Sequence, residues 1–164
     1  MAEVTASALL TTVLGFVGLF VLWWAYFALA GHGTAVSGRG DGSTAALRFA
    51  FAYAHALRVA GAIVAAVSIE LRITHAETGP ALVLTTVGGP LIDLVGNILF
   101  LRSRTGTVTR DRYVAAGALV VIGLVALPLG HALPPLFVRL AVLAVTATLA
   151  VVSQLRTGRA AAIA

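Results

Sequence analysis

Five apolar stretches, each about 20 residues long, occupy most of this 164-residue chain, at residues 8–30, 47–69, 80–101, 113–133 and 136–155. An α-helix rises 1.5 Å per residue, so about 20 helical residues cross the roughly 30 Å core of a bilayer. None of the stretches alternates apolar and polar residues as a strand of a membrane barrel does. The sequence therefore predicts an all-α fold, a polytopic integral membrane helix bundle with five transmembrane helices in a single domain, residues 1–164.

The composition supports a membrane location. Hydrophobic residues make up 60% of the chain and charged residues only 10%, and a soluble domain of this size cannot bury so much apolar surface in one core. The net charge of +5 comes from 11 basic residues, which gather at the ends of the apolar stretches and so indicate membrane topology rather than nucleic-acid binding. Cysteine is absent, and no phosphate-binding or catalytic motif occurs. We expect no enzyme activity, no cofactor and no metal site.

The basic residues also predict the orientation. With five spans, residues 31–46, residues 102–112 and the C-terminal tail share one side of the membrane. Eight arginines lie in or beside these segments: Arg39, Arg48, Arg102, Arg104, Arg110, Arg112, Arg156 and Arg159. On the other side only Arg72 occurs, beside Glu3, Glu70 and Glu77. Because positive residues stay on the cytoplasmic side, we expect the N-terminus outside and the C-terminus inside.

Interfacial residues are expected near both membrane surfaces. Aromatic rings favour the headgroup level, and four of them mark the inner end of the first stretch as an interfacial aromatic belt: Trp23, Trp24, Tyr26 and Phe27. At the outer surface, Arg72 is expected at a solvated helix end. Arg139 lies about one turn inside the outer boundary and is expected to extend to the headgroups.

Polar residues inside the second and third stretches lie at matching depths. By helical rise, Arg58 is about 15 Å and Asp93 about 13 Å above the inner boundary, while His55 is at about 10 Å and Asn97 at about 8 Å. A charge inside a span costs roughly 2.5–3.5 kcal/mol and therefore favours a partner. We predict an intramembrane polar layer formed by His55, Arg58, Asp93 and Asn97, with an ion pair between Arg58 and Asp93.

Three roles for this layer are open. An ion pair and a hydrogen bond can fix the register of two helices. Alternatively, the ionisable residues form part of a proton or ion path, since histidine changes charge near neutral pH. A third possibility is a pocket in which Arg58 holds the anionic head group of a small molecule or lipid.

Several short segments resemble a known family. Residues 22–27 read Leu-Trp-Trp-Ala-Tyr-Phe, residues 53–55 Tyr-Ala-His, residues 88–90 Gly-Gly-Pro and residues 96–100 Gly-Asn-Ile-Leu-Phe. In order and spacing, these segments resemble the bacterial low temperature requirement A (LtrA) family. Arg58 and Asp93 depart from that pattern, which has an apolar residue at the first position and an apolar or aromatic residue at the second.

The resemblance covers roughly residues 14–156 and only the C-terminal half of the family, whose members are about twice as long. It implies a multi-pass protein of the bacterial cytoplasmic (inner) membrane, linked to growth in the cold. We expect it to be a permease-like or channel-like component, or alternatively a non-transporting scaffold or half-protein subunit. The expected partners are the lipid bilayer and either a second copy, as a homo-oligomer, or a separate membrane-protein half; no nucleic acid is expected.

Overall fold

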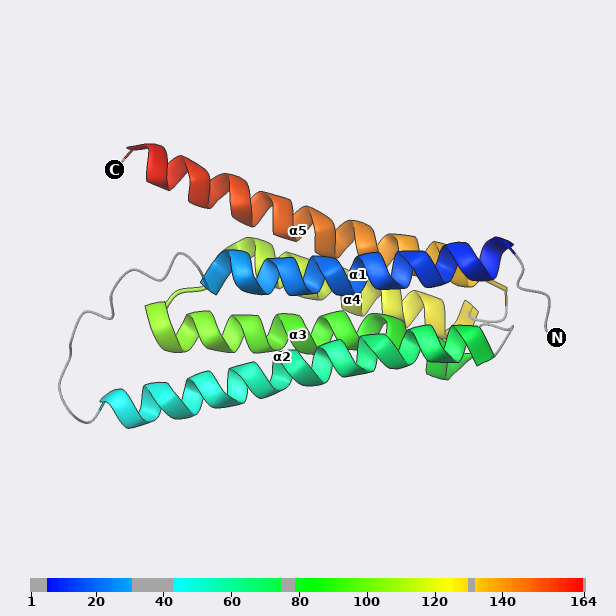
Figure 1. The fold of residues 1–164 in the computed structure, drawn as a ribbon, viewed down its shortest axis with the longest axis horizontal. Coiled ribbons are helices and arrows are strands. Elements are labelled where there is room, and N and C mark those ends of the chain that lie inside the picture. The colour runs from blue at the N-terminus through cyan, green and yellow to red at the C-terminus, as the bar shows by residue number, and fades with distance from the viewer. Residues whose placement is uncertain (1–5, 31–42, 75–78, 130–131, 164) are drawn as a thin grey trace.

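Five helices follow one another along the chain in the computed structural model, which describes residues 6–30, 43–74, 79–129 and 132–163. They are α1 (Ala6–Ala30), α2 (Ser43–Thr74), α3 (Pro80–Thr105), α4 (Arg110–Leu129) and α5 (Pro135–Ile163). No strand occurs in these ranges, so the all-α prediction is confirmed there. Successive helices run antiparallel, and the start of α1 and the end of α5 lie at opposite ends of the bundle (Figure 1).

Three of the helices are long and apolar enough to cross a membrane, in the segments Pro80–Ser103, Arg110–Leu129 and Pro135–Arg156. In α1 the described apolar segment, Leu9–Ala25, is shorter, and α2 does not reach this threshold. In the α4 segment and in the α5 segment, only 22% of the apolar span is buried inside the bundle. Most of the apolar side chains of these two helices therefore face outward. Apolar surface of this extent is typical of a helix surrounded by lipid. Crossing of the membrane by all five helices stays a prediction.

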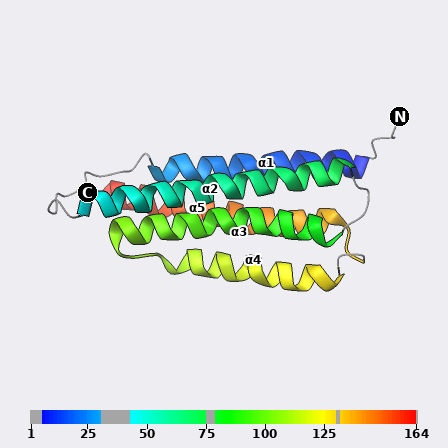
Figure 2. The ribbon, with the colours of Figure 1, turned by 90° about the horizontal axis from the view of Figure 1, so that it is seen from below.

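Helix α3 occupies the centre of the bundle. It packs most extensively against α2 and also contacts α4 and α5, while α1 contacts α2 and α5. Figure 2 shows α3 between α2 and α4. Because α3 has neighbours on several sides, a larger share of its span, 56%, is buried.

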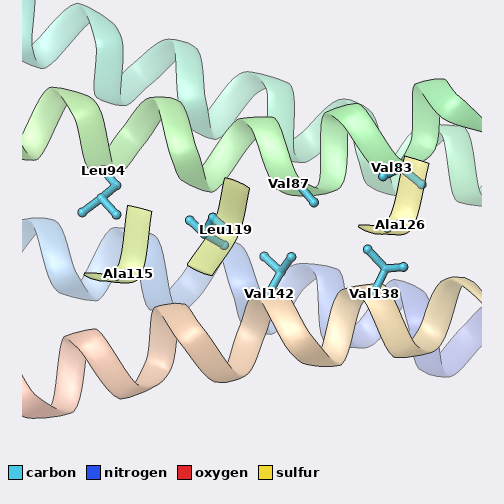
Figure 3. Packing of buried hydrophobic residues seen from close by; sticks show 8 residues of the cluster. All are labelled: Val83, Val87, Leu94, Ala115, Leu119, Ala126, Val138 and Val142. Atoms are coloured by element: carbon cyan, nitrogen blue, oxygen red, sulfur yellow. The ribbon is translucent and has the colours of Figure 1, made fainter. Parts of the chain in front are cut away.

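The hydrophobic core lies between α3, α4 and α5 (Figure 3). It is made of small and branched side chains from these helices: Val83, Val87, Leu94, Ala115, Leu119, Ala126, Val138 and Val142. On α4 the buried positions follow helical spacing of three, four and seven residues, from Arg112 to Ala126. One face of α4 therefore points inward along its whole length.

Glycines allow the backbones of α2 and α3 to touch. A Cβ at Gly61 would lie 2.6 Å from both the Asp93 nitrogen and the Gly89 oxygen, and a Cβ at Gly89 would lie 2.6 Å from the Ala65 nitrogen. A Cβ at Gly96 would lie 2.9 Å from the carbonyl oxygen of Ala54 on α2. Small residues of this kind support close helix packing where no water is present to drive association.

The helix ends differ from the sequence-based boundaries in ways that local chemistry explains. Helix α3 begins at Pro80, where a missing N–H does no harm, and closes at Gly106, whose φ of 71° favours glycine. Helix α4 ends at Leu129, not at residue 133. The residue before a proline avoids helical geometry, and Leu133 precedes Pro134. The N–H group of Leu133 donates to the Leu129 carbonyl at 2.9 Å and closes the turn.

Substitution of two adjacent glycines tests the contact between α2 and α3. Gly89→Ala places a methyl group against the Ala65 backbone, so we expect it to destabilise the protein by about 1–3 kcal/mol. Gly88→Ala is the matched control, because its Cβ meets nothing within 4 Å and alanine favours the helix. Denaturant unfolding in detergent measures the free energy of unfolding of both variants. Equal stability of the two variants would contradict the close contact.

Candidate functional site

An ion pair joins α2 to α3 inside the bundle. The Arg58 Nε atom donates to Oδ1 of Asp93 at 3.1 Å, and the two side chains are only 7% and 12% exposed. The stem of Arg58 lies over Gly96, where a Cβ would come within 2.8 Å of the Arg58 Cγ. The structure thus brings together the two opposite charges that helical rise places at one depth.

A second arginine continues this polar layer from α4. The Arg112 Nε atom donates to Oδ1 of Asn97 at 2.8 Å, and Nη1 donates to the Thr109 hydroxyl. Arg112 is buried and belongs to helix α4, so its assignment to a loop, which rested on the sequence, is wrong. The α4 helix begins at Arg110 and therefore carries Arg112 on its inward face.

His55 lies apart from this layer. Its side chain is exposed, and its ring stacks on Phe51 with the ring centroids 6.3 Å apart. The face of α2 that meets α3 is centred on small residues such as Ala54 and Gly61, which let the backbones approach. His55 is rotated by about 100° from Ala54 around the helix, and the Phe51 ring on which it stacks also contacts Phe100 of α3. Its predicted place beside Asn97 stays a prediction, and Asn97 accepts a hydrogen bond from Arg112.

The polar layer lines an internal cavity of about 50 Å³. Arg58, Asp93, Asn97 and Arg112 all contribute to its wall, and the remaining lining includes side chains of α1 and α5. From α5 come the polar residues Thr146, Ser153 and Gln154. A space of this size holds roughly three to five water molecules, at about 10–15 Å³ for each. The charged groups therefore lie at the edge of an internal cavity whose wall is otherwise mostly apolar.

Another buried arginine lies nearer the opposite end of the bundle. The Arg139 Nη2 atom on α5 donates to both the carbonyl oxygen and the hydroxyl of Ser68 on α2, at 3.1 Å each. The guanidinium group of Arg139 packs against Gly15 of α1, where any Cβ would collide with it. The expectation that Arg139 extends to the headgroups is wrong, since it is only 5% exposed. Arg72, expected at a solvated helix end, is buried too.

The aromatic residues of α1 are described only in part. Trp23 and Trp24 are 55% and 41% exposed, and the ring of Trp23 stacks against Phe20 at 5.8 Å. The side chains of Tyr26 and Phe27 lie outside the described part of the structure. The interfacial aromatic belt stays a prediction.

The chemistry available in the site is that of charged and hydrogen-bonding groups. Among the described residues, no three His, Cys, Asp or Glu side chains come close enough to hold a metal ion. Guanidinium groups donate several hydrogen bonds in a fixed plane and keep their charge at physiological pH. The arrangement is thus suited to binding an ion or a small polar solute.

A helical bundle with an apolar exterior and charged residues in its interior is the class of protein defined by this fold and site, and it is consistent with a membrane protein. The family model for the bacterial low temperature requirement A protein (LtrA) matches residues 1–151. The chain therefore belongs to the LtrA family, as the sequence segments indicate. No curated protein and no solved structure matches it.

A double-mutant cycle tests the ion pair. Arg58→Met or Asp93→Leu alone leaves a buried charge without its counterion, so each should cost about 3–5 kcal/mol of unfolding free energy. The double substitution should be far milder, and the exchange Arg58→Asp with Asp93→Arg should recover much of the loss. Thermal unfolding in detergent measures the coupling between the sites.

The control is the exposed ion pair between Arg156 and Asp111, whose atoms are 2.7 Å apart. Arg156→Ala should change stability by less than about 1 kcal/mol, because water screens this pair. If the losses at Arg58 and Asp93 simply add, the two residues do not stabilise one another.

Proposed function

We propose that this protein crosses the bacterial cytoplasmic membrane five times, with its N-terminus outside, and acts there as a permease-like or channel-like component rather than an enzyme. It moves a small solute or ion past the buried polar layer. The observation that carries this proposal is the cavity inside the bundle, which is lined by charged side chains of α2, α3 and α4. Ionisable residues within spans often mark such routes.

A purely structural role explains less of the site. Fixing the register of α2 against α3 requires only the Arg58–Asp93 pair and the close glycine contact. Arg112 adds a further buried charge, together with Asn97, at the same cavity. Burying an extra charge is unfavourable unless a polar space or a ligand compensates for it. Passage of a polar solute accounts for both the extra charge and the cavity.

Flux through the purified protein tests this function. Proteoliposomes containing the protein should equilibrate small ions faster than empty liposomes. Ala150→Leu places a larger side chain at the cavity wall and should lower the flux at least about fivefold by filling the space. Val151→Leu is the control, since Val151 is exposed on the same helix outside the cavity. Flux no greater than that of empty liposomes would overturn the proposal.

The orientation can be tested without removing any native thiol, because the chain has no cysteine. Ala132→Cys lies in the turn between α4 and α5 and should react with a membrane-impermeant maleimide on intact cells. Thr107→Cys lies between α3 and α4, at the opposite end of the bundle, and should react only after permeabilisation. The reverse pattern would contradict the proposed orientation, and labelling of both on intact cells would contradict the five-span topology.

A scaffold or half-protein role is the second candidate, and a groove on the surface favours it. Small residues from α4 and α5, among them Ala118 and Ala144, line an open groove of about 440 Å³. Small residues at a surface in lipid permit another helix to pack closely. In this role a second copy or a separate membrane-protein half covers the groove.

Association is measured by native mass spectrometry in mild detergent. If the groove is an interface, Ala118→Trp should shift a dimer or complex to single chains, whereas Phe137→Trp, on an exposed site outside the groove, should not. If the unsubstituted protein has the mass of a single chain and also conducts ions in proteoliposomes, the permease-like function is favoured over the scaffold.

A further inference from the structure

The cavity in the polar layer carries an excess of positive charge. Its lining includes two guanidinium groups, Arg58 and Arg112, and a single carboxylate, Asp93, so the net charge of the wall is +1. The Asp93 carboxylate accepts from Arg58, whereas Arg112 donates to the neutral Asn97 and to a hydroxyl group.

The acidic residue next to Arg112 in the sequence, Asp111, attracts it electrostatically but forms its ion pair with another arginine. Asp111 forms an ion pair with Arg156, with Oδ2 2.7 Å from Nη1, and the Asp111 side chain is partly exposed. It is not part of the cavity wall. The cavity therefore attracts an anion, which would accept hydrogen bonds from guanidinium groups and from the hydroxyl-bearing side chains of α5.

A second, smaller cavity lies toward the other end of the bundle. It measures about 30 Å³, and its wall includes Ser68, Thr86 and Arg139. Both cavities are lined by Leu22, Pro90 and Thr146, so these residues form the boundary between them. Arg139, like Arg112, donates to neutral groups, here on Ser68.

The two cavities lie in series along the bundle axis. On α5, Arg139 belongs to one cavity and Ser153 to the other, and 14 residues of helix separate them by about 21 Å. This distance covers roughly two-thirds of the 30 Å hydrocarbon core. Each cavity thus has its own arginine at a different depth of the membrane.

We infer that the polar interior is a binding path for small monovalent inorganic anions, with Arg112 as the ligand of the inner site and Arg139 as that of the outer site. This inference rests on the proposed function and specifies the solute. The volumes admit a chloride or nitrate ion with a few water molecules and are too small for a lipid head group. Binding at two separate sites allows an ion to leave one as another arrives.

Anion binding is measured apart from transport. The protein is placed in nanodiscs of uncharged lipid, and its thermal unfolding is followed at constant ionic strength while chloride or nitrate replaces gluconate. A ligand that binds only the folded state raises the midpoint as its concentration increases. We expect such a rise, and we expect Arg112→Gln to weaken the apparent affinity by about tenfold or more, since a charged donor is lost.

Two further variants keep the measurement decisive. Arg110→Gln is the matched control: Arg110 is exposed two residues before Arg112, so the anion response should be unchanged. If Arg112→Gln does not fold, Ala150→Leu serves instead, because it occupies the cavity and leaves both arginines in place. It should abolish the response at the inner site.

The outcomes separate the inference from the proposed function. Anion-dependent stability that Arg112→Gln removes, together with anion-selective dilution potentials in proteoliposomes, supports both. Anion binding without flux supports the site but overturns the transport function. Cation-selective flux, or stability that does not respond to the anion, overturns the anion path. An equal loss of response in Arg110→Gln and Arg112→Gln also overturns it, because a surface effect would then explain the binding.

Discussion

The interior of this bundle depends on the ion pair between Arg58 and Asp93. In an apolar environment each charge alone would be strongly unfavourable, and the two become tolerable only when their atoms meet. The glycines of α2 and α3 make that meeting possible, because they bring the two backbones into contact and leave space for the stem of Arg58 over Gly96. The close packing of α2 against α3 and the ion pair between them therefore depend on each other. The remaining polar groups, Asn97 and Arg112, are arranged around it.

Much of the fold could be predicted from the sequence, because a bilayer allows few solutions. Helix length and apolar composition were enough to predict five helices, and helical rise was enough to place Arg58 level with Asp93. Both rules depend only on backbone geometry, which varies little between proteins. The predicted family also follows from local segments, and it is confirmed by the match over residues 1–151.

The parts that were missed depend on which face of a helix turns inward. His55 was predicted in the layer from helical rise and from the face that it shares with Arg58, whereas the face of α2 that meets α3 is centred on Ala54, Gly61 and other small residues. Arg112 could have been found, since it continues the spacing of buried positions on α4 through Ala115 and Leu119. Thr109, just before the helix, was a further signal that α4 begins earlier than residue 113.

The proposed function of this LtrA-family protein requires one physical property, a bundle interior that water can reach. Two neighbouring positions on α5 test this property most directly. Ser153 lines the cavity, whereas Val151 is exposed on the outer surface, two residues away and at nearly the same depth. A thiol reacts as the thiolate, which forms in a polar and electropositive site but not in hydrocarbon.

The decisive measurement is the rate at which a small hydrophilic methanethiosulfonate modifies Ser153→Cys and Val151→Cys in proteoliposomes, in a chain that has no other cysteine. The account predicts that Ser153→Cys reacts faster by about tenfold or more, because its thiol faces the polar cavity. Equal rates, or faster reaction of Val151→Cys, would contradict a water-accessible interior.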